Sequence, residues 1–226
     1  MRPVVTVVDY GRSNLLSVRR ALEHCGADVR FAAEPGDVLR AGALVLPGVG
    51  AFADGMAQLH RQRLVEPLLQ KAGEGTPLLG ICLGMQMLLD SSTEGGLNKG
   101  LGLVEGTVEP LPEKTAEGAS LKVPHIGWSA LTLAPGAERG LFKNTKNGDE
   151  VYFVHSFQAL PRRREDCAAT VEYGGRTVCA AVQRENVTGF QFHPEKKRPG
   201  GPCHAASLCG GAGLTCGVDE GACRAL

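Results

Sequence analysis

Apolar runs alternate with helical patterns through the first hundred residues. The run at 4–8 is almost wholly β-branched, which suits a strand buried on both faces of a sheet. From Leu15 to Gly26, apolar residues recur at steps of three and four, which predicts an amphipathic helix. Further strands are predicted at 29–32, 43–46 and 78–81, and further helices at 56–69, interrupted at Pro67, and at 83–89. Such alternation is typical of a parallel sheet covered by helices.

The pattern changes near Thr107, where short strands separated by turns replace the alternation. Strands are predicted at 151–157, 168–173, 178–183 and 189–192. The expected fold class is therefore α/β, with a mostly parallel central sheet, flanking helices and added antiparallel strands. A chain of 226 residues, 43% of them hydrophobic, suffices for one sizeable core, and residues 1–196 are interpreted as one domain.

The apolar periodicity ends after Lys196. Residues 197–226 contain seven glycines and four cysteines but no aromatic residue, so no apolar helix face can be drawn. We expect this segment to be disordered, and the abrupt change in composition suggests a frameshifted or otherwise altered reading. The alternative is a zinc site, but the cysteine spacings do not match the short knuckles that zinc favours, and no metal site is expected. Its ligands would be Cys203, Cys209, Cys216, Cys223 and His204.

Charge and hydropathy exclude several kinds of partner. Basic and acidic residues are equal at 24 each, so the chain has no basic field for nucleic acid or an anionic membrane. No run approaches the roughly 18 apolar residues of a membrane-spanning helix, and the first apolar run is too short for a signal peptide. A cytoplasmic location with reduced thiols is expected, so the cysteines are considered singly.

Cys82 differs from the other cysteines because it falls between a predicted strand and a predicted helix. The flanking Gly80 and Gly84 leave room for the sharp turn of a nucleophile elbow. A helix N-terminus stabilises a thiolate, and the Leu83 N–H would face a developing oxyanion. Most cysteines are buried core residues without a chemical role. Cys25, Cys167 and Cys179 are interpreted in this way, as packing thiols.

A base for this nucleophile is predicted at the end of the last strand. His193 and Glu195 lie two residues apart, so in an extended chain they share a face, and the carboxylate can orient the imidazole. With Cys82 they would form a triad of nucleophile, base and orienting group. Such a histidine alone is more often structural. His24 and His60 are interpreted as surface or packing residues, and His125 and His155 receive no role.

Six segments of the sequence resemble a known family. They are DYG at 9–11 with Asn14, PGVGAF at 47–52, GICLGMQ at 80–86, KVPHIGW at 122–128, YFVHSF at 152–157 and GFQFHPEK at 189–196. The elbow and HPE are similar to class I glutamine amidotransferases in general. The DYG, PGVGAF and PHIGW segments narrow the resemblance to the glutaminase subunit of imidazole glycerol phosphate synthase, over about residues 4–196, and imply its flavodoxin-like fold.

The resemblance implies a role for individual residues. Cys82 would attack the side-chain amide carbon of glutamine, His193 would protonate the departing ammonia, and Glu195 would hold the imidazole. The oxyanion hole would be formed by Val49 and Leu83. The amino-acid end of glutamine would be bound by Gly50, Gln86 and Glu94. The residues facing a partner protein would be Asn14, Tyr152 and Lys196.

In that family, ammonia passes to a (βα)8-barrel cyclase that forms imidazole glycerol phosphate and aminoimidazole carboxamide ribotide in histidine biosynthesis. The resemblance therefore implies a heterodimer, glutamine as substrate and no cofactor. Ser129 and Phe157 depart from the asparagine and tyrosine that are usual there. Two alternatives stay open: the glutaminase of another synthase or a related thiol hydrolase, and a binding subunit whose altered C-terminus impairs catalysis.

Overall fold

A computed structural model describes residues 2–137, 142 and 145–196, and the predicted tail with its alternative zinc ligands lies outside them. None of the described helices has the length and apolar character needed to cross a bilayer. The helices are α1 (Leu15–His24), α2 (Pro35–Leu39), α3 (Phe52–Arg61), α4 (Val65–Gly73), α5 (Leu83–Met87) and the 3-10 turn η2 (Arg164–Asp166).

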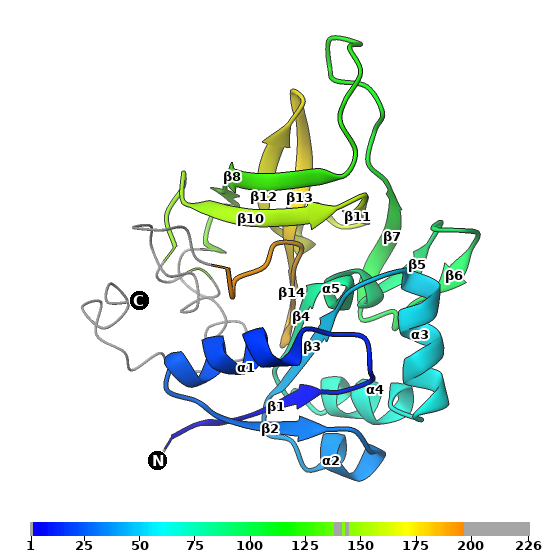
Figure 1. Ribbon diagram of the computed structural model, residues 1–226, viewed down its shortest axis with the longest axis vertical. Coiled ribbons are helices and arrows are strands. Elements are labelled where there is room, and N and C mark those ends of the chain that lie inside the picture. Colours follow the sequence, from blue (N-terminus) through cyan, green and yellow to red (C-terminus); the bar gives the residue numbers. More distant parts are fainter. Residues whose placement is uncertain (1, 138–141, 143–144, 197–226) are drawn as a thin grey trace.

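The central sheet has eight strands, and their order separates a parallel half from an antiparallel half (Figure 1). The order is β2 (Asp28–Ala32), β1 (Val4–Val8), β3 (Leu44–Gly48), β4 (Leu78–Cys82), β14 (Val187–Phe190), β13 (Arg176–Arg184), β12 (Cys167–Tyr173) and β9 (Thr132–Leu133). The strands from β2 to β14 are parallel, and β13, β12 and β9 extend the sheet in antiparallel pairs. The predicted α/β class with added antiparallel strands is therefore confirmed.

Two smaller sheets accompany the central sheet in the described part of the chain. One is a ribbon of β8 (His125–Ala130) and β10 (Glu150–His155), and it lies above the final segment 191–196 (Figure 1). The other contains β11 (Phe157–Pro161), β7 (Val104–Pro110), β5 (Leu89–Ser92) and β6 (Asn98–Lys99). The chain between β7 and β8 projects from the body as a long loop (Figure 1).

Successive residues of the parallel strands face opposite sides of the sheet, and each side has its own core. Val45 and Leu79 join a cluster with α1 on one side, whereas Leu44, Leu46 and Leu78 join a cluster with α2 to α5 on the other. Burial on both sides explains why these strands are continuous apolar runs.

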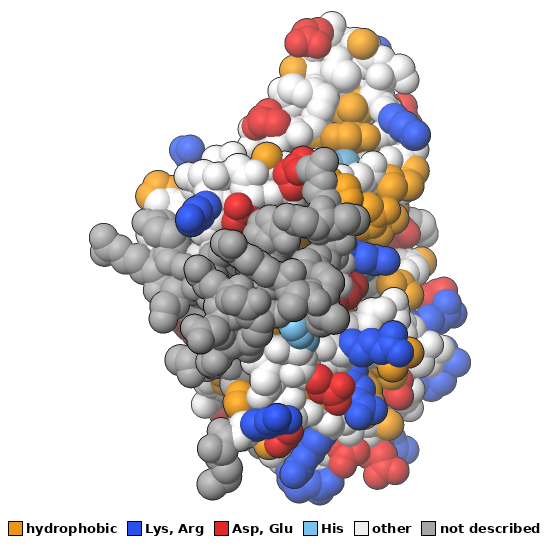
Figure 2. All heavy atoms as spheres, turned by 60° about the vertical axis from the view of Figure 1, so that its left-hand side comes forward, with side chains coloured by type: hydrophobic (Ala, Val, Ile, Leu, Met, Phe, Trp, Pro, Cys, Tyr) orange, Lys and Arg blue, Asp and Glu red, His pale blue; other side chains and the backbone are white. Residues whose placement is uncertain are grey.

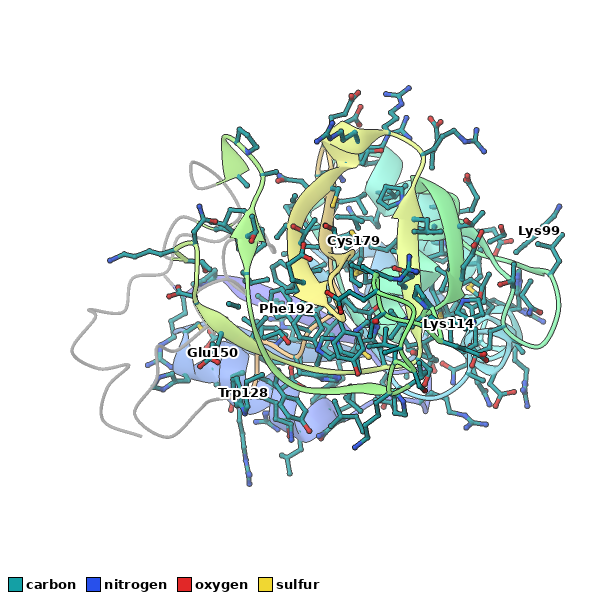
Figure 3. The ribbon with its side chains drawn as sticks, turned by 90° about the horizontal axis from the view of Figure 1, so that it is seen from above. Lys99, Lys114, Trp128, Glu150, Cys179 and Phe192 are labelled. Carbon is teal, nitrogen blue, oxygen red and sulfur yellow. The ribbon has the colours of Figure 1, made fainter. Side chains whose placement is uncertain are left out.

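Aromatic side chains join the ribbon to the central sheet. Phe192 stacks on Phe190 with ring centroids 4.7 Å apart and meets Phe153 of β10 edge-on at 6.0 Å. Phe192 lies within the body of the protein, whereas Trp128 lies toward its periphery (Figure 3). The segment that carries His193 is thus fixed between the sheet and the ribbon.

Three predicted elements differ from the structure. The helix expected at 56–69 is two helices, α3 and α4, and Pro67 lies in the first turn of α4, where its missing N–H costs no hydrogen bond. The helix expected at 83–89 ends at Met87, because the chain continues as β5. The strand expected at 151–157 divides at Ser156 into β10 and β11, which belong to different sheets.

Candidate active site

Cys82 occupies the junction of β4 and α5, where the backbone turns sharply. Its φ of 55° and ψ of −111° are rare for a residue with a side chain, and such strain is frequent at functional sites. Gly80 permits this turn, because a Cβ there would lie 2.7 Å from the Gly84 carbonyl and the Met85 nitrogen. The residue is 8% exposed, so the elbow is largely enclosed by the protein.

Strand register brings the other predicted residues to Cys82. Gly48 of β3 pairs with Cys82, which places the turn at 48–50 beside the nucleophile. On the other side, Phe190 of β14 pairs with Ile81, so the chain that follows β14 passes the elbow. A sulfur and an imidazole separated by more than a hundred residues are thereby brought together.

His193 is held from both sides. Its Nδ1 is 2.8 Å from Glu195 Oε1, and its backbone N–H donates to the Tyr152 carbonyl at 2.9 Å. Burial favours the neutral ring, but interaction with Cys82 and Glu195 outweighs burial and raises the pKa of His193 to about 10. Nε2 is buried and forms no hydrogen bond of standard geometry with the described residues. A charged imidazole therefore faces the sulfur near neutral pH, and it can both stabilise a thiolate and donate a proton.

The two predicted oxyanion donors differ in whether their N–H groups are already hydrogen-bonded within the protein. The Leu83 N–H is at the first position of α5, where helix geometry leaves a donor without an intrahelical partner. The Val49 N–H instead donates to the Arg12 carbonyl at 3.0 Å. In this conformation Val49 does not offer its N–H to an oxyanion, so a hole with both donors requires the peptide to turn.

The residues predicted to bind glutamine are also engaged with the protein. Glu94 Oε2 accepts the Phe52 N–H at 2.7 Å, at the start of α3. Gly50 is exposed and has a φ of +95°, which glycine adopts without strain. Gln86 is buried, and both hydrogens of its amide nitrogen are used within the protein, so only its Oε1 is left for a ligand.

Two of the three predicted partner-facing residues lie close to His193. Lys196 Nζ is 6.0 Å from the centre of the Tyr152 ring, and Trp128 meets the same ring edge-on at 5.5 Å. Asn14 is exposed and caps α1, with its Oδ1 accepting the Ser17 N–H at 3.4 Å. Charges of both signs are intermixed over the lower part of one face of the protein, and apolar side chains gather higher up (Figure 2).

Several residues of the site carry no role in the sequence-based prediction. Gln191 is fully buried, and its Nε2 is 3.9 Å from Cys82 Sγ. The available signal was its position in the same motif, QFHPE at 191–195. The extended chain expected there is wrong, because β14 ends at Phe190 and the Lys196 N–H closes a turn onto the His193 carbonyl at 3.1 Å. The Tyr10 hydroxyl is buried without a hydrogen-bond partner among the described residues, and burial, followed by the charge of Cys82, raises its pKa.

His125 and His155 form a buried pair whose tautomers follow from their partners. His155 Nδ1 is 2.8 Å from the Phe157 carbonyl, which only accepts, so this nitrogen carries the proton. His155 Nε2 must then accept from His125 Nδ1 at 3.1 Å, and His125 Nε2 must accept from the Ser129 hydroxyl at 2.9 Å. Burial lowers the pKa of both histidines to about 4, which keeps them neutral near pH 7.

Cys25, Cys167 and Cys179, the other cysteines in the described part of the chain, pack away from the elbow and form no metal cluster. Cys25 and Cys179 are buried, and Cys167 is half-buried with its Sγ 3.5 Å from that of Cys179. Both members of this pair are free thiols. No group of three or more potential metal ligands occurs within the described part of the chain.

An elbow cysteine facing a histidine that is held by a carboxylate is the arrangement of a cysteine-dependent amide hydrolase. The family profile described as glutamine amidotransferase class-I matches residues 6–203. The chain therefore belongs to the class I glutamine amidotransferase family, and it is an enzyme.

Curated relatives narrow the comparison within this family. The chain is 45% identical over 195 residues to "Imidazole glycerol phosphate synthase subunit HisH 1" of Legionella pneumophila (strain Lens), covering 85% of this chain and 92% of that protein. It is 46% identical over 197 residues to the HisH subunit of Moorella thermoacetica, covering 87% and 89%.

Solved structures support the fold. PurLQS from Thermotoga maritima superimposes with a TM-score of 0.68 at 20% identity, covering 92% of this chain and 96% of that one. A glutamine amidotransferase from the same organism gives a TM-score of 0.58 at 16% identity, covering 86% and 77%. At these identities the likeness concerns the fold alone.

Proposed function

We propose that this chain hydrolyses glutamine to glutamate and ammonia with Cys82, His193 and Glu195, and supplies the ammonia to the cyclase subunit of an imidazole glycerol phosphate synthase. The position of His193, held by Glu195 at 2.8 Å and facing the strained cysteine elbow, is the observation that carries the chemistry. The HisH relatives, matched over nearly their whole length, support the choice of synthase.

The reaction proceeds in two halves. The Cys82 thiolate attacks the amide carbon, and the carbonyl oxygen becomes an oxyanion beside the Leu83 N–H. His193 donates its proton to the amide nitrogen, the C–N bond breaks, and ammonia leaves a thioester on Cys82. The neutral His193 then takes a proton from water as the water oxygen attacks the thioester, which releases glutamate and restores the thiolate and the imidazolium.

The proposed contacts to glutamine use protein groups that still have free hydrogen-bond acceptors or an open backbone. Glu94 keeps carboxylate lone pairs beyond its bond to the Phe52 N–H, and a carboxylate suits the α-ammonium of glutamine. Gln86 Oε1 accepts from the same ammonium, and the open turn at Gly50 lets the ligand approach the backbone. Glutamine hydrolysis by Glu94→Gln is expected to show a raised KM with a smaller change in kcat.

The hydrogen bond of the Val49 N–H leads us to expect that glutaminase activity depends on the partner subunit. Because the Val49 N–H is bonded to the Arg12 carbonyl, one of the two proposed oxyanion donors is engaged elsewhere. Losing one such donor typically costs 10²–10³-fold in kcat, so the isolated chain is expected to be slow. Partner contacts at Asn14, Tyr152 and Lys196 would favour the conformation with both donors, and we place this complex in the cytoplasm.

The test is ammonia release from glutamine by the full chain, with and without a (βα)8-barrel cyclase subunit and its nucleotide ligand. Stimulation by this cyclase supports the proposed synthase. Equal stimulation by the partner of another synthase, such as that for anthranilate, would favour the broader glutaminase assignment. Failure to hydrolyse glutamine with any partner, in a folded chain, would support the impaired binding subunit.

A further inference from the structure

We infer that Gln191 is a positioning residue for the nucleophile, donating an N–H to the Cys82 sulfur from an amide whose orientation the surrounding structure fixes. The inference rests on the proposed function, in which Cys82 is the nucleophile. Gln191 is fully buried, and its Nε2 is 3.9 Å from Cys82 Sγ, within the range of a hydrogen bond to sulfur. A buried amide has to satisfy its polar atoms inside the protein.

The orientation of Gln191 follows from its second neighbour, Gln86. The Gln86 Nε2 donates to Gln191 Oε1 at 3.0 Å and to the Phe157 carbonyl at 3.2 Å. A carbonyl only accepts, so the amide nitrogen of Gln86 must face Phe157. Its other hydrogen then requires an oxygen on Gln191, which leaves the Gln191 nitrogen facing the sulfur.

A flip of either amide would break this chain of donors. If the Gln86 amide turned over, its oxygen would face the Phe157 carbonyl and Gln191 Oε1, so three acceptors would meet without a proton. Leaving buried polar groups unpaired costs more than an ordinary hydrogen bond gives. His155 Nδ1 also donates to the Phe157 carbonyl, at 2.8 Å, so both lone pairs of this oxygen are used and it is held in place.

The consequence for catalysis concerns the sulfur. A thiolate accepts hydrogen bonds more strongly than a thiol, so an N–H fixed toward the sulfur favours the reactive form. It also holds the side chain in one orientation on a strained backbone. His193 provides the charge and Gln191 provides a second, uncharged contact. Gln191 and His193 both lie in the short irregular segment that follows β14, so one segment presents both groups to Cys82.

Two substitutions of similar volume separate this role from packing. Gln191→Glu keeps an acceptor for Gln86 but replaces the N–H at the sulfur with an oxygen, and Gln191→Met removes both hydrogen bonds. Gln183→Glu, on the adjacent strand β13 and outside this network, is the matched control for the change of amide to carboxylate. Each full-length variant is compared with the parent protein by thermal unfolding.

The measured quantities are the rate of Cys82 alkylation by iodoacetamide, followed by peptide mapping, and the kcat and KM for glutamine. In both Gln191 variants we expect the alkylation rate and kcat to fall about ten- to hundredfold, with KM within about threefold of the parent. Alkylation rates in the Gln191 variants equal to that of Gln183→Glu would overturn the inference. If Gln191→Glu does not fold, Gln191→Met decides.

The alkylation measurement is independent of the proposed function. If the parent protein alkylates at Cys82 but hydrolyses no glutamine, the glutaminase proposal fails. The comparison of alkylation rates still decides whether Gln191 acts on the sulfur. A loss of kcat accompanied by an equal loss of thermal stability and an unchanged alkylation rate would assign Gln191 to packing and overturn the inference.

Discussion

The two sides of the site are built by different physical means. On the nucleophile side, β3, β4 and α5 approach so closely that only glycine fits at the contacts, and Cys82 is placed by backbone shape. On the base side, polar side chains and carbonyls place His193 through hydrogen bonds, with little help from close packing of backbone. The nucleophile is thus fixed by backbone sterics, and the base by polar contacts on a segment that aromatic packing holds in place.

This difference determines whether a substitution on each side affects the stability of the protein or its activity. Steric overlap at a backbone contact affects folding as a whole, because protein interiors are close-packed and do not yield locally. Loss of one polar contact at His193 costs less stability and acts chiefly on the protonation or orientation of the imidazole. Mutations on the nucleophile side should therefore act on stability, and mutations on the base side should act mainly on chemistry and on pH dependence.

The largest effect is expected on the base side, in activity. His193→Asn removes the proton donor for the departing ammonia, and kcat for glutamine hydrolysis should fall about 10³-fold or more, equivalent to about 4 kcal/mol of activation free energy. Steady-state glutamate release measures it. His60→Asn, at an exposed position on α3, is the control and should retain full activity. A loss of less than tenfold in the His193 variant would remove this residue from the proposed mechanism.

Gly84→Ala should give the largest effect on stability, and it tests the nucleophile side. An added Cβ would overlap the Leu46 carbonyl of β3, so the backbone must shift. The free energy of unfolding should drop by about 3 kcal/mol or more, measured by urea denaturation. Gly73→Ala in α4 is the matched control, because a Cβ there meets nothing within 4 Å. Equal stability of the two variants would contradict the steric account.

Acid should weaken the fold through the buried histidine pair. Burial, chiefly, lowers the pKa of His125 and His155 to about 4, whereas unfolded histidines titrate near 6.5. The unfolded chain therefore binds more protons in this range, and stability is lost as the pH falls from about 6.5 toward 4. Each histidine contributes on the order of 2–3 kcal/mol. Urea midpoints across this range measure it, and His155→Gln should flatten the dependence. If His155→Gln kept the pH dependence of the parent protein, the loss of stability in acid would not come from the histidine pair.

Ser129→Ala should have the smallest effect. The Ser129 hydroxyl donates to His125 Nε2 at 2.9 Å, and without it a buried acceptor has no partner. A destabilisation of about 1 kcal/mol is expected by chemical denaturation. Thr177→Ala, which removes an exposed hydroxyl bonded to Glu172, should change stability by less than about 0.5 kcal/mol. The same small change in both variants would mean that the histidine chain does not depend on its terminal donor.

The nucleophile side was largely predictable from the sequence. A β-branched or apolar run predicts a buried strand by itself, and small residues around Cys82 indicate a tight turn without reference to distant parts of the chain. The strands at β1, β3 and β4 and the elbow therefore follow from local patterns. The short helix α2 was missed because five residues do not establish a helical period.

The base side was predictable only in part. The spacing of two residues relates His193 to Glu195, but nothing local indicates that β14 pairs with β4 or that Phe157 offers its carbonyl to both Gln86 and His155. Those contacts depend on register between strands from three different sheets. The state of the Val49 N–H also depends on a carbonyl at Arg12, which no motif signals.

The most direct test of the central chemistry is covalent labelling of the full-length chain with a diazo ketone analogue of glutamine, followed by peptide mass mapping. The account predicts one adduct, on Cys82, that is absent from Cys82→Ser and strongly reduced in His193→Asn. A folded protein that leaves Cys82 unmodified, or that carries the adduct on Cys25, Cys167 or Cys179 instead, would contradict it.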